Sequence, residues 1–199
     1  MDREWQAVVA LEEGDRLREA GRLPEAAAAL QRAVACKEDF VEAILVWADV
    51  LVELGRSREA IPVMERLVNL DPRSCQAHNY LGLVQAKAGC REEAQQSFQR
   101  ALELEPHFAE ALVNLGVLEW EQGQEEEALA HFEQAARLEP GNRELVAELA
   151  LLYARSGQLQ AAIGALREYL AGHPEDAELQ AQLAEVLRAV AEKGNGKEG

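Results

Sequence analysis

The stretch that decides the fold is CQAHNYLGLVQAKAGCREEAQQSFQRALELEPHF, residues 75–108. It contains one of five glycines that stand 34 residues apart, and an alanine follows each glycine by five residues. The glycines are Gly21, Gly55, Gly89, Gly123 and Gly157, and the alanines are Ala26, Ala60, Ala94, Ala128 and Ala162. Since glycine is about 7% of average usage, chance gives such a series with a probability on the order of 10⁻⁵. The chain is therefore an array of repeats.

The phase of the array follows from where glycine is favoured. The residue just past a helix end often takes the left-handed conformation that glycine tolerates best, so each glycine predicts the end of a first helix. Proline 17 residues later, as at Pro106, predicts the end of the second helix. The first repeat has Glu38 there, so we expect its second helix to end less sharply. The resulting repeats are 7–40, 41–74, 75–108, 109–142 and 143–176, with a capping helix at 177–192.

We predict an all-α fold of about eleven helices in antiparallel pairs, forming a single array over residues 1–192. Residues 193–199 are predicted to be a disordered tail. Within each pair, small residues such as Gly82 and Ala94 should let the two backbones approach closely. Larger apolar residues, such as Met64 and Phe98, should fill the remaining gaps.

Composition restricts the classes of partner. The chain is 48% hydrophobic, as an ordered core requires, and carries a net charge of −16. This charge disfavours DNA, RNA and anionic lipid and favours a basic protein or peptide. The sequence contains no uncharged apolar run long enough to span a membrane, so we expect no direct membrane insertion. Three cysteines without a CxxC spacing, and a start without a basic signal-type region, predict reduced thiols in a cytoplasmic protein.

Catalytic motifs are missing from the sequence. The four histidines form no i, i+4 pair and no HExxH motif, which is the helical zinc-site pattern. The periodic glycines end helices and are not followed by the Lys-Ser/Thr of a phosphate-binding loop. Cys90 has no histidine nearby in the sequence that would support a nucleophile. We therefore predict a non-enzyme without catalytic residues, cofactor or metal.

A family resemblance is carried by His78-x-x-Leu81-Gly82-x-x-Gln85, Ala94-x-x-x-Phe98 and Pro106. This pattern resembles the tetratricopeptide repeat (TPR), although His78 replaces the usual tryptophan and Gln85 the usual tyrosine. The resemblance covers about residues 7–192. It implies an α-solenoid, a right-handed TPR superhelix whose first helices line a concave groove. It also implies a solvating helix at the end of the array.

The resemblance assigns the groove to positions 2, 5, 6, 9, 12 and 13 of each first helix. We expect a peptide or helix of a partner to bind there through apolar and asparagine contacts, with acidic flanks that favour basic residues. The predicted binding residues are Leu45, Asp49, Asn79, Tyr80, Leu83, Glu110, Val113, Asn114, Val117, Trp120, Glu121, Glu148 and Leu151. For Tyr80, packing between adjacent first helices is an equally good interpretation.

Two classes of function remain open. In the first, the protein is an adaptor, scaffold or co-chaperone that grips a segment of a partner. Capture of acidic chaperone tails, a known use of this family, is disfavoured because Glu144 and Glu148 stand where that clamp requires cations. In the second, the protein is a self-assembling structural scaffold that forms homo-oligomers, in which its N-terminal edge, which includes Trp5 and Leu11, docks into the groove or the end of a neighbouring copy. Nothing in the sequence identifies the partner.

Overall fold

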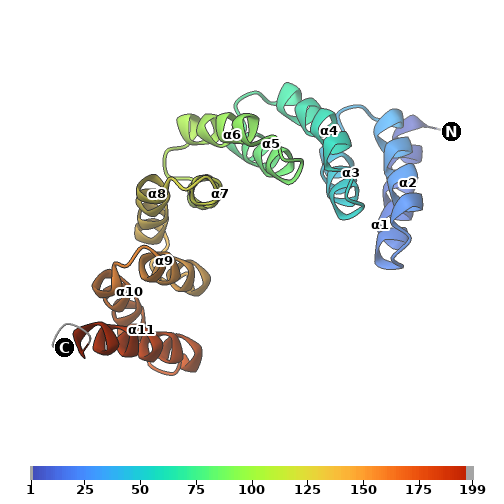
Figure 1. Cartoon of the computed structure of the whole chain (residues 1–199). Coiled ribbons are helices and arrows are strands. Elements are labelled where there is room, and N and C mark those ends of the chain that lie inside the picture. The colour runs from blue at the N-terminus through green and yellow to red at the C-terminus, as the bar shows by residue number, and fades with distance from the viewer. Residues whose placement is uncertain (1, 196–199) are drawn as a thin grey trace. The chain divides into compact units, whose positions relative to one another are not determined.

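A computed structural model describes residues 2–195, and these residues form eleven α-helices and no strand, as predicted (Figure 1). The chain divides into two compact units, Met1–Pro106 and His107–Gly199. The first contains α1 (Arg3–Glu19), α2 (Leu23–Cys36), α3 (Val41–Glu53), α4 (Ser57–Leu70), α5 (Cys75–Lys87) and α6 (Arg91–Leu104). The second contains α7 (Ala109–Glu121), α8 (Glu125–Leu138), α9 (Arg143–Arg155), α10 (Leu159–Gly172) and α11 (Ala177–Asn195). None of the described helices is long and apolar enough to cross a membrane.

The periodic glycines end the first helix of every pair, as their phase predicts. All five have φ between 71° and 81°, the left-handed region. After α5, the N–H of Cys90 donates to the carbonyl of Gln85 at 2.9 Å, and that of Gly89 donates to the carbonyl of Ala86 at 3.0 Å. This pair of bonds is the Schellman motif, which satisfies carbonyls that a helix end leaves without partners. The repeat thus sets helix length through backbone conformation.

The second helix of the first repeat does not end less sharply than the others, so that expectation is wrong. α2 ends at Cys36, the same repeat position as Leu70 at the end of α4, although no proline follows it. The N–H of Lys37 donates to the carbonyl of Ala33 at 3.0 Å, and the next backbone conformation is extended. The same bond follows α4, where the N–H of Asp71 donates to the carbonyl of Leu67 at 3.2 Å. Proline is therefore not required for the second helix to end at this repeat position.

Each antiparallel pair is held together by the close approach that the small residues predicted. The five periodic alanines are completely buried, and the large residues one turn later on the same helices, such as Met64 and Phe98, are 1% exposed. A Cβ atom built on Gly82 would lie 2.6 Å from Cε1 of Phe98, closer than two such atoms can approach. Glycine at this position therefore makes room for the phenylalanine ring of the facing helix.

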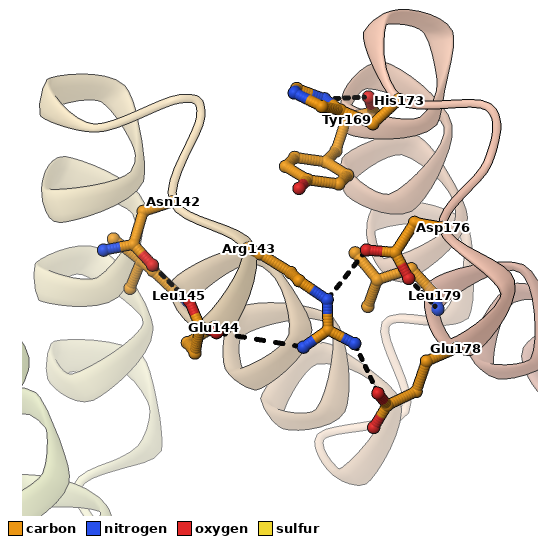
Figure 2. A network of polar contacts seen from close by, with 9 residues as sticks. All are labelled: Asn142, Arg143, Glu144, Leu145, Tyr169, His173, Asp176, Glu178 and Leu179. Carbon is orange, nitrogen blue, oxygen red and sulfur yellow. Dashed lines mark hydrogen bonds and ion pairs between the residues drawn. The ribbon is translucent and has the colours of Figure 1, made fainter.

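Within the second unit, a polar network attaches α11 to α9 (Figure 2). Arg143 at the start of α9 donates from Nε to Asp176 at 2.8 Å and forms an ion pair with Glu178. Asp176 also accepts a hydrogen bond from the N–H of Leu179 at 3.1 Å and so caps α11. α11 continues to Asn195, beyond the predicted end at 192, and residues 196–199 of the predicted tail lie outside the described residues.

Candidate functional site

A groove of about 630 Å³ in the second unit collects four of the predicted binding residues. Glu110, Val113 and Val117 enter it from α7, and Glu148 enters it from α9. The half-exposed valines form an apolar floor, in which Val117 is 41% exposed. This arrangement joins an apolar surface to carboxylates, which is the chemistry predicted for a ligand that carries both basic and apolar residues.

Further acidic residues complete this groove, which we call the α7/α9 groove. Glu144 lies one helical turn before Glu148, and the end of α8 contributes Glu139. Asn142 fixes the loop between α8 and α9, because its Nδ2 donates to Glu139 at 2.8 Å and its Oδ1 accepts from the N–H of Leu145 at 3.1 Å. Glu110, Glu144 and Glu148 are all exposed. The cap therefore positions the first turn of α9 at a site of concentrated negative charge.

The first unit contains the corresponding groove between α3 and α5, with a volume of about 450 Å³. It contains the predicted residues Leu45 and Tyr80, of which Tyr80 is 40% exposed. Gln76 and Tyr80 occupy the repeat positions that Glu144 and Glu148 occupy in the second unit. Because of these two replacements, this α3/α5 groove is less acidic than its counterpart, and an exposed tyrosine stands where the α7/α9 groove has Glu148.

Sequence reasoning predicted two of the ten residues that line the α3/α5 groove, and the exposed apolar residues Val41 and Leu70 are among those it missed. Val41 begins α3 and Leu70 ends α4, and they are 46% and 44% exposed. Both lie outside the six positions that the family resemblance assigned to the groove. Their signal in the sequence is an apolar residue at a helix terminus, which does not distinguish a groove wall from an ordinary hydrophobic helix cap.

Asn79 is a correction to the predicted binding set. We expected it to bind the main chain of a ligand, but its side chain is only 1% exposed. α5 packs against both α4 and α6, and these neighbours cover the side chain. Asn79 therefore belongs to the interior of the first unit and cannot contact a ligand without rearrangement.

The remaining predicted residues lie outside the two grooves. Asp49 and Leu83 do not line the α3/α5 groove. In the second unit, four predicted residues do not line the α7/α9 groove, and they are Asn114, Trp120, Glu121 and Leu151. Repeat position alone therefore does not select the residues that share a groove. Of these outlying residues, Asp49 has a perturbed carboxyl group: desolvation raises its pKa, and the nearby positive charge of Arg18 opposes this shift.

Residues 2–195 contain no group of three or more histidine, cysteine, aspartate or glutamate side chains arranged to hold a metal ion. The cysteines Cys36, Cys75 and Cys90 are free thiols. Cys75 is buried, and burial together with a hydrogen bond to Glu105 raises the pKa of its thiol. A raised pKa disfavours the reactive thiolate, so this cysteine is poorly suited to be a nucleophile.

Sequence profiles of known families match two parts of the chain. The profile of the cilia and flagella-associated protein 70 middle TPR-like domain matches residues 63–171, more than half of the chain. The profile of the bacterial transcriptional activator domain matches residues 6–104. No curated protein matches the sequence.

Solved structures with a similar fold cover most of the chain. A crystal structure of MamA is 22% identical, covers 87% of this chain and 94% of its own, and has a TM-score of 0.69. A thermophilic TPR protein of Thermus thermophilus is 24% identical, with coverages of 91% and 98% and a TM-score of 0.64. YrrB, described as a TPR protein with an unusual peptide-binding site, is 22% identical, with coverages of 90% and 92% and a TM-score of 0.61. At these identities the similarity concerns the fold.

Proposed function

The chain belongs to the tetratricopeptide-repeat family, whose fold is generally a protein–protein interaction module, and on this premise we propose that it is a peptide-binding adaptor that acts without catalysis. Its main binding site is the α7/α9 groove, and its ligand is a segment of a partner protein with basic and apolar side chains. The observation that carries this proposal is the meeting of Val113 and Val117 with three exposed carboxylates in one groove.

The charges of the groove argue for a basic ligand. No arginine or lysine lines the groove. Glu144 has a partner outside it, since its Oε1 lies 3.8 Å from Nη1 of Arg143, whose other nitrogens bind Asp176 and Glu178 (Figure 2). A lysine or arginine side chain can therefore lie against the valine floor with its stem and reach a carboxylate with its charged head. YrrB, which shares the fold, is described as having a peptide-binding site, and this gives general support to a peptide as the ligand.

A charge-removal experiment tests this site. The variant Glu110→Gln with Glu148→Gln should weaken the binding of a peptide of alternating lysine and leucine by roughly tenfold or more, as expected when hydrogen bonds to charged groups are lost. The control is Glu125→Gln with Glu126→Gln, which removes the same charge from exposed positions at the start of α8 outside the groove. Isothermal titration calorimetry measures both. Equal weakening in the two variants would show that overall charge attracts the peptide and that the groove does not.

The apolar part of the site has a separate test. Val117→Asn should weaken binding of the same peptide without changing the charge of the groove, and should leave the thermal unfolding temperature nearly unchanged, because Val117 is already 41% exposed. If this variant binds as tightly as the wild type, the valine floor is not part of the binding site.

A second candidate function is self-assembly through the N-terminal helix. Trp5 and Val8 on α1 are 55% and 41% exposed, an unusual exposure for a tryptophan next to another large apolar residue. Light scattering after size-exclusion chromatography tests it with Trp5→Glu. A mass that rises with concentration in the wild type, but not in the variant, would support self-assembly. A monomer at all concentrations would eliminate this candidate.

The free thiols support a reducing, cytoplasmic compartment for the protein. Thiol labelling of the protein as isolated from cells, with and without prior reduction, tests this placement. Full labelling without reduction is expected, and blocked thiols would argue against it.

A further inference from the structure

The first unit contains a pocket of about 650 Å³ between α2, α3 and α4 that the groove hypothesis does not use. It shares no lining residue with the α3/α5 groove. Three arginines line it, namely Arg56, Arg58 and Arg66, against Glu59 as the single acidic lining residue. In a chain with 36 acidic and 20 basic residues, this is an unexpected local excess of positive charge.

Arg66 gives the strongest indication of an external ligand. Its Nη2 atom is buried and makes no hydrogen bond within the described residues. The acidic group paired with it is the exposed Glu38, whose Oε2 lies 3.6 Å away, within ion-pair range but too far for a hydrogen bond. This nitrogen has lost water and gained no hydrogen bond, which is costly. Arg66 lines the pocket with a side chain that is 34% exposed, so an external carboxylate can pair with it in place of the distant Glu38.

The other two arginines differ in how they are engaged. Arg56 is held by Glu59, with hydrogen bonds of 2.7 Å and 2.6 Å to its two carboxylate oxygens. Arg58 is exposed and takes part in no ion pair among residues 2–195. Two guanidinium groups, those of Arg58 and Arg66, therefore remain for an anion. Guanidinium groups bind carboxylates through paired N–H donors.

The rest of the pocket wall is apolar. Trp47 of α3 contributes its partly exposed ring, and Pro62 and Val63 contribute from α4. In the next three repeats the position of Trp47 is occupied by leucine, at Leu81, Leu115 and Leu149. The flat ring provides a surface on which an apolar or aromatic side chain can pack beside the arginines.

We propose that this pocket binds an acidic peptide segment. Aspartate or glutamate carboxylates of the segment pair with Arg58 and Arg66, and a neighbouring apolar side chain packs on Trp47 and Pro62. The apolar wall favours a peptide over a free anion such as phosphate, which would leave that wall uncovered. The pocket has the opposite charge preference to the α7/α9 groove, so the protein binds two chemically different segments, one in each compact unit.

Calorimetry with a defined probe tests the proposal. The probe is an acetylated, amidated hexapeptide of alternating glutamate and leucine, long enough to span roughly 20 Å when extended. Arg66→Gln and Arg58→Gln should each weaken its binding by roughly tenfold or more. Arg100→Gln is the matched control, because Arg100 on α6 is an exposed arginine paired with Glu103 outside the pocket, and it should leave binding unchanged.

Trp47→Leu provides a test that does not change the charge. Leucine occupies this position in other repeats, so the variant should fold, and it should bind the glutamate–leucine peptide at least roughly threefold more weakly through lost apolar contact. The basic peptide of the α7/α9 groove should bind all of these variants as it binds the wild type. Failure of the acidic-peptide site and failure of the groove are thereby distinguished.

Three results would overturn the proposal. The first is equal binding of a control peptide in which glutamine replaces every glutamate. The second is binding that is unchanged by Arg66→Gln and Arg58→Gln. The third is displacement of the peptide by inorganic phosphate at concentrations similar to those of the peptide, which would identify a phosphate site in place of a peptide site.

Discussion

The close approach of α5 and α6 at Gly82 predicts that a single added methyl group destabilises the protein. In Gly82→Ala, the new Cβ would lie 2.6 Å from Cε1 and 2.7 Å from Cδ1 of Phe98. The ring is 1% exposed and enclosed on all sides, so it can yield only by moving its neighbours. Gly164→Ala is a matched control, because Gly164 lies within α10 and a Cβ there meets no atom within 4 Å.

The magnitude follows from two opposing terms. Replacing glycine by alanine inside a helix stabilises it by about 1 kcal/mol, and this term applies to both variants. Overpacking a buried site costs about 1–3 kcal/mol, and this term applies only at Gly82. Gly164→Ala should therefore be stabilised by about 1 kcal/mol, while Gly82→Ala should lie about 1–3 kcal/mol below it in unfolding free energy. In a chain of this size, each kcal/mol corresponds to about 2–4 °C in the thermal midpoint.

Urea unfolding followed by circular dichroism measures both variants, and a second substitution identifies the contact responsible. The second repeat places Ala48 opposite Met64, so Phe98→Met combined with Gly82→Ala copies a pair that the chain already accommodates. Gly82→Ala should cost at least about 1 kcal/mol less in the Phe98→Met background than in the wild type. If Gly82→Ala is instead as stabilising as Gly164→Ala, the close-packing argument is wrong.

Three further predictions concern a helix end, a helix cap and a thiol. Gly89→Ala should lower the unfolding free energy by about 1–2 kcal/mol, because a φ of 80° strains any residue that has a Cβ atom, although the added Cβ would contact no other atom. Asparagine tolerates this conformation better, so Gly89→Asn should cost less. Equal costs of the two variants in urea unfolding would contradict this explanation. The N–H of Leu179 holds the pKa of the Asp176 carboxyl below its usual range, so the ionised carboxylate contributes stability that is present at neutral pH and lost as pH falls below about 4. Asparagine also caps helices but carries no charge, so the stability difference from Asp176→Asn should shrink over that window, and a constant difference would refute the contribution of the carboxylate charge. Burial and the hydrogen bond to Glu105 raise the pKa of the Cys75 thiol, so Cys75 should be the slowest of the three thiols to react with a disulfide reagent at pH 8. Glu105→Gln should accelerate the reaction of Cys75. An unchanged rate would show that burial alone protects the thiol.

The regular part of the fold could be predicted because it depends on local chemistry. The residue past each first helix adopts a positive φ, glycine does this without strain, and so the period of Gly89 and its equivalents located the ends of the first helices. The completely buried alanines were predicted for a similar reason, since facing backbones that approach closely leave room only for small side chains. The end of α2 was predicted less well, because the chain turns to an extended conformation at Lys37 without a proline after it.

The candidate grooves could be predicted only in part. A position within a helix gives the direction of a side chain, but its exposure depends on the neighbouring helices. Val113 and Val117 share a groove with Glu148, whereas Asn79 is covered although it occupies the same repeat position as Val113. No pattern in the sequence indicated that Arg66 would keep a buried donor without an acceptor, because that depends on distances between side chains of different helices.

By itself, the sequence determined the repeat, its phase, the all-helical class and the negative charge that favours basic ligands, because these properties depend on residues acting locally or summed over the chain. Tertiary structure alone decided which carboxylates meet the valines of α7, and that an arginine-lined pocket opens beside Trp47. Both are contacts between separate helices, and their side-chain packing varies from repeat to repeat while the backbone period remains the same.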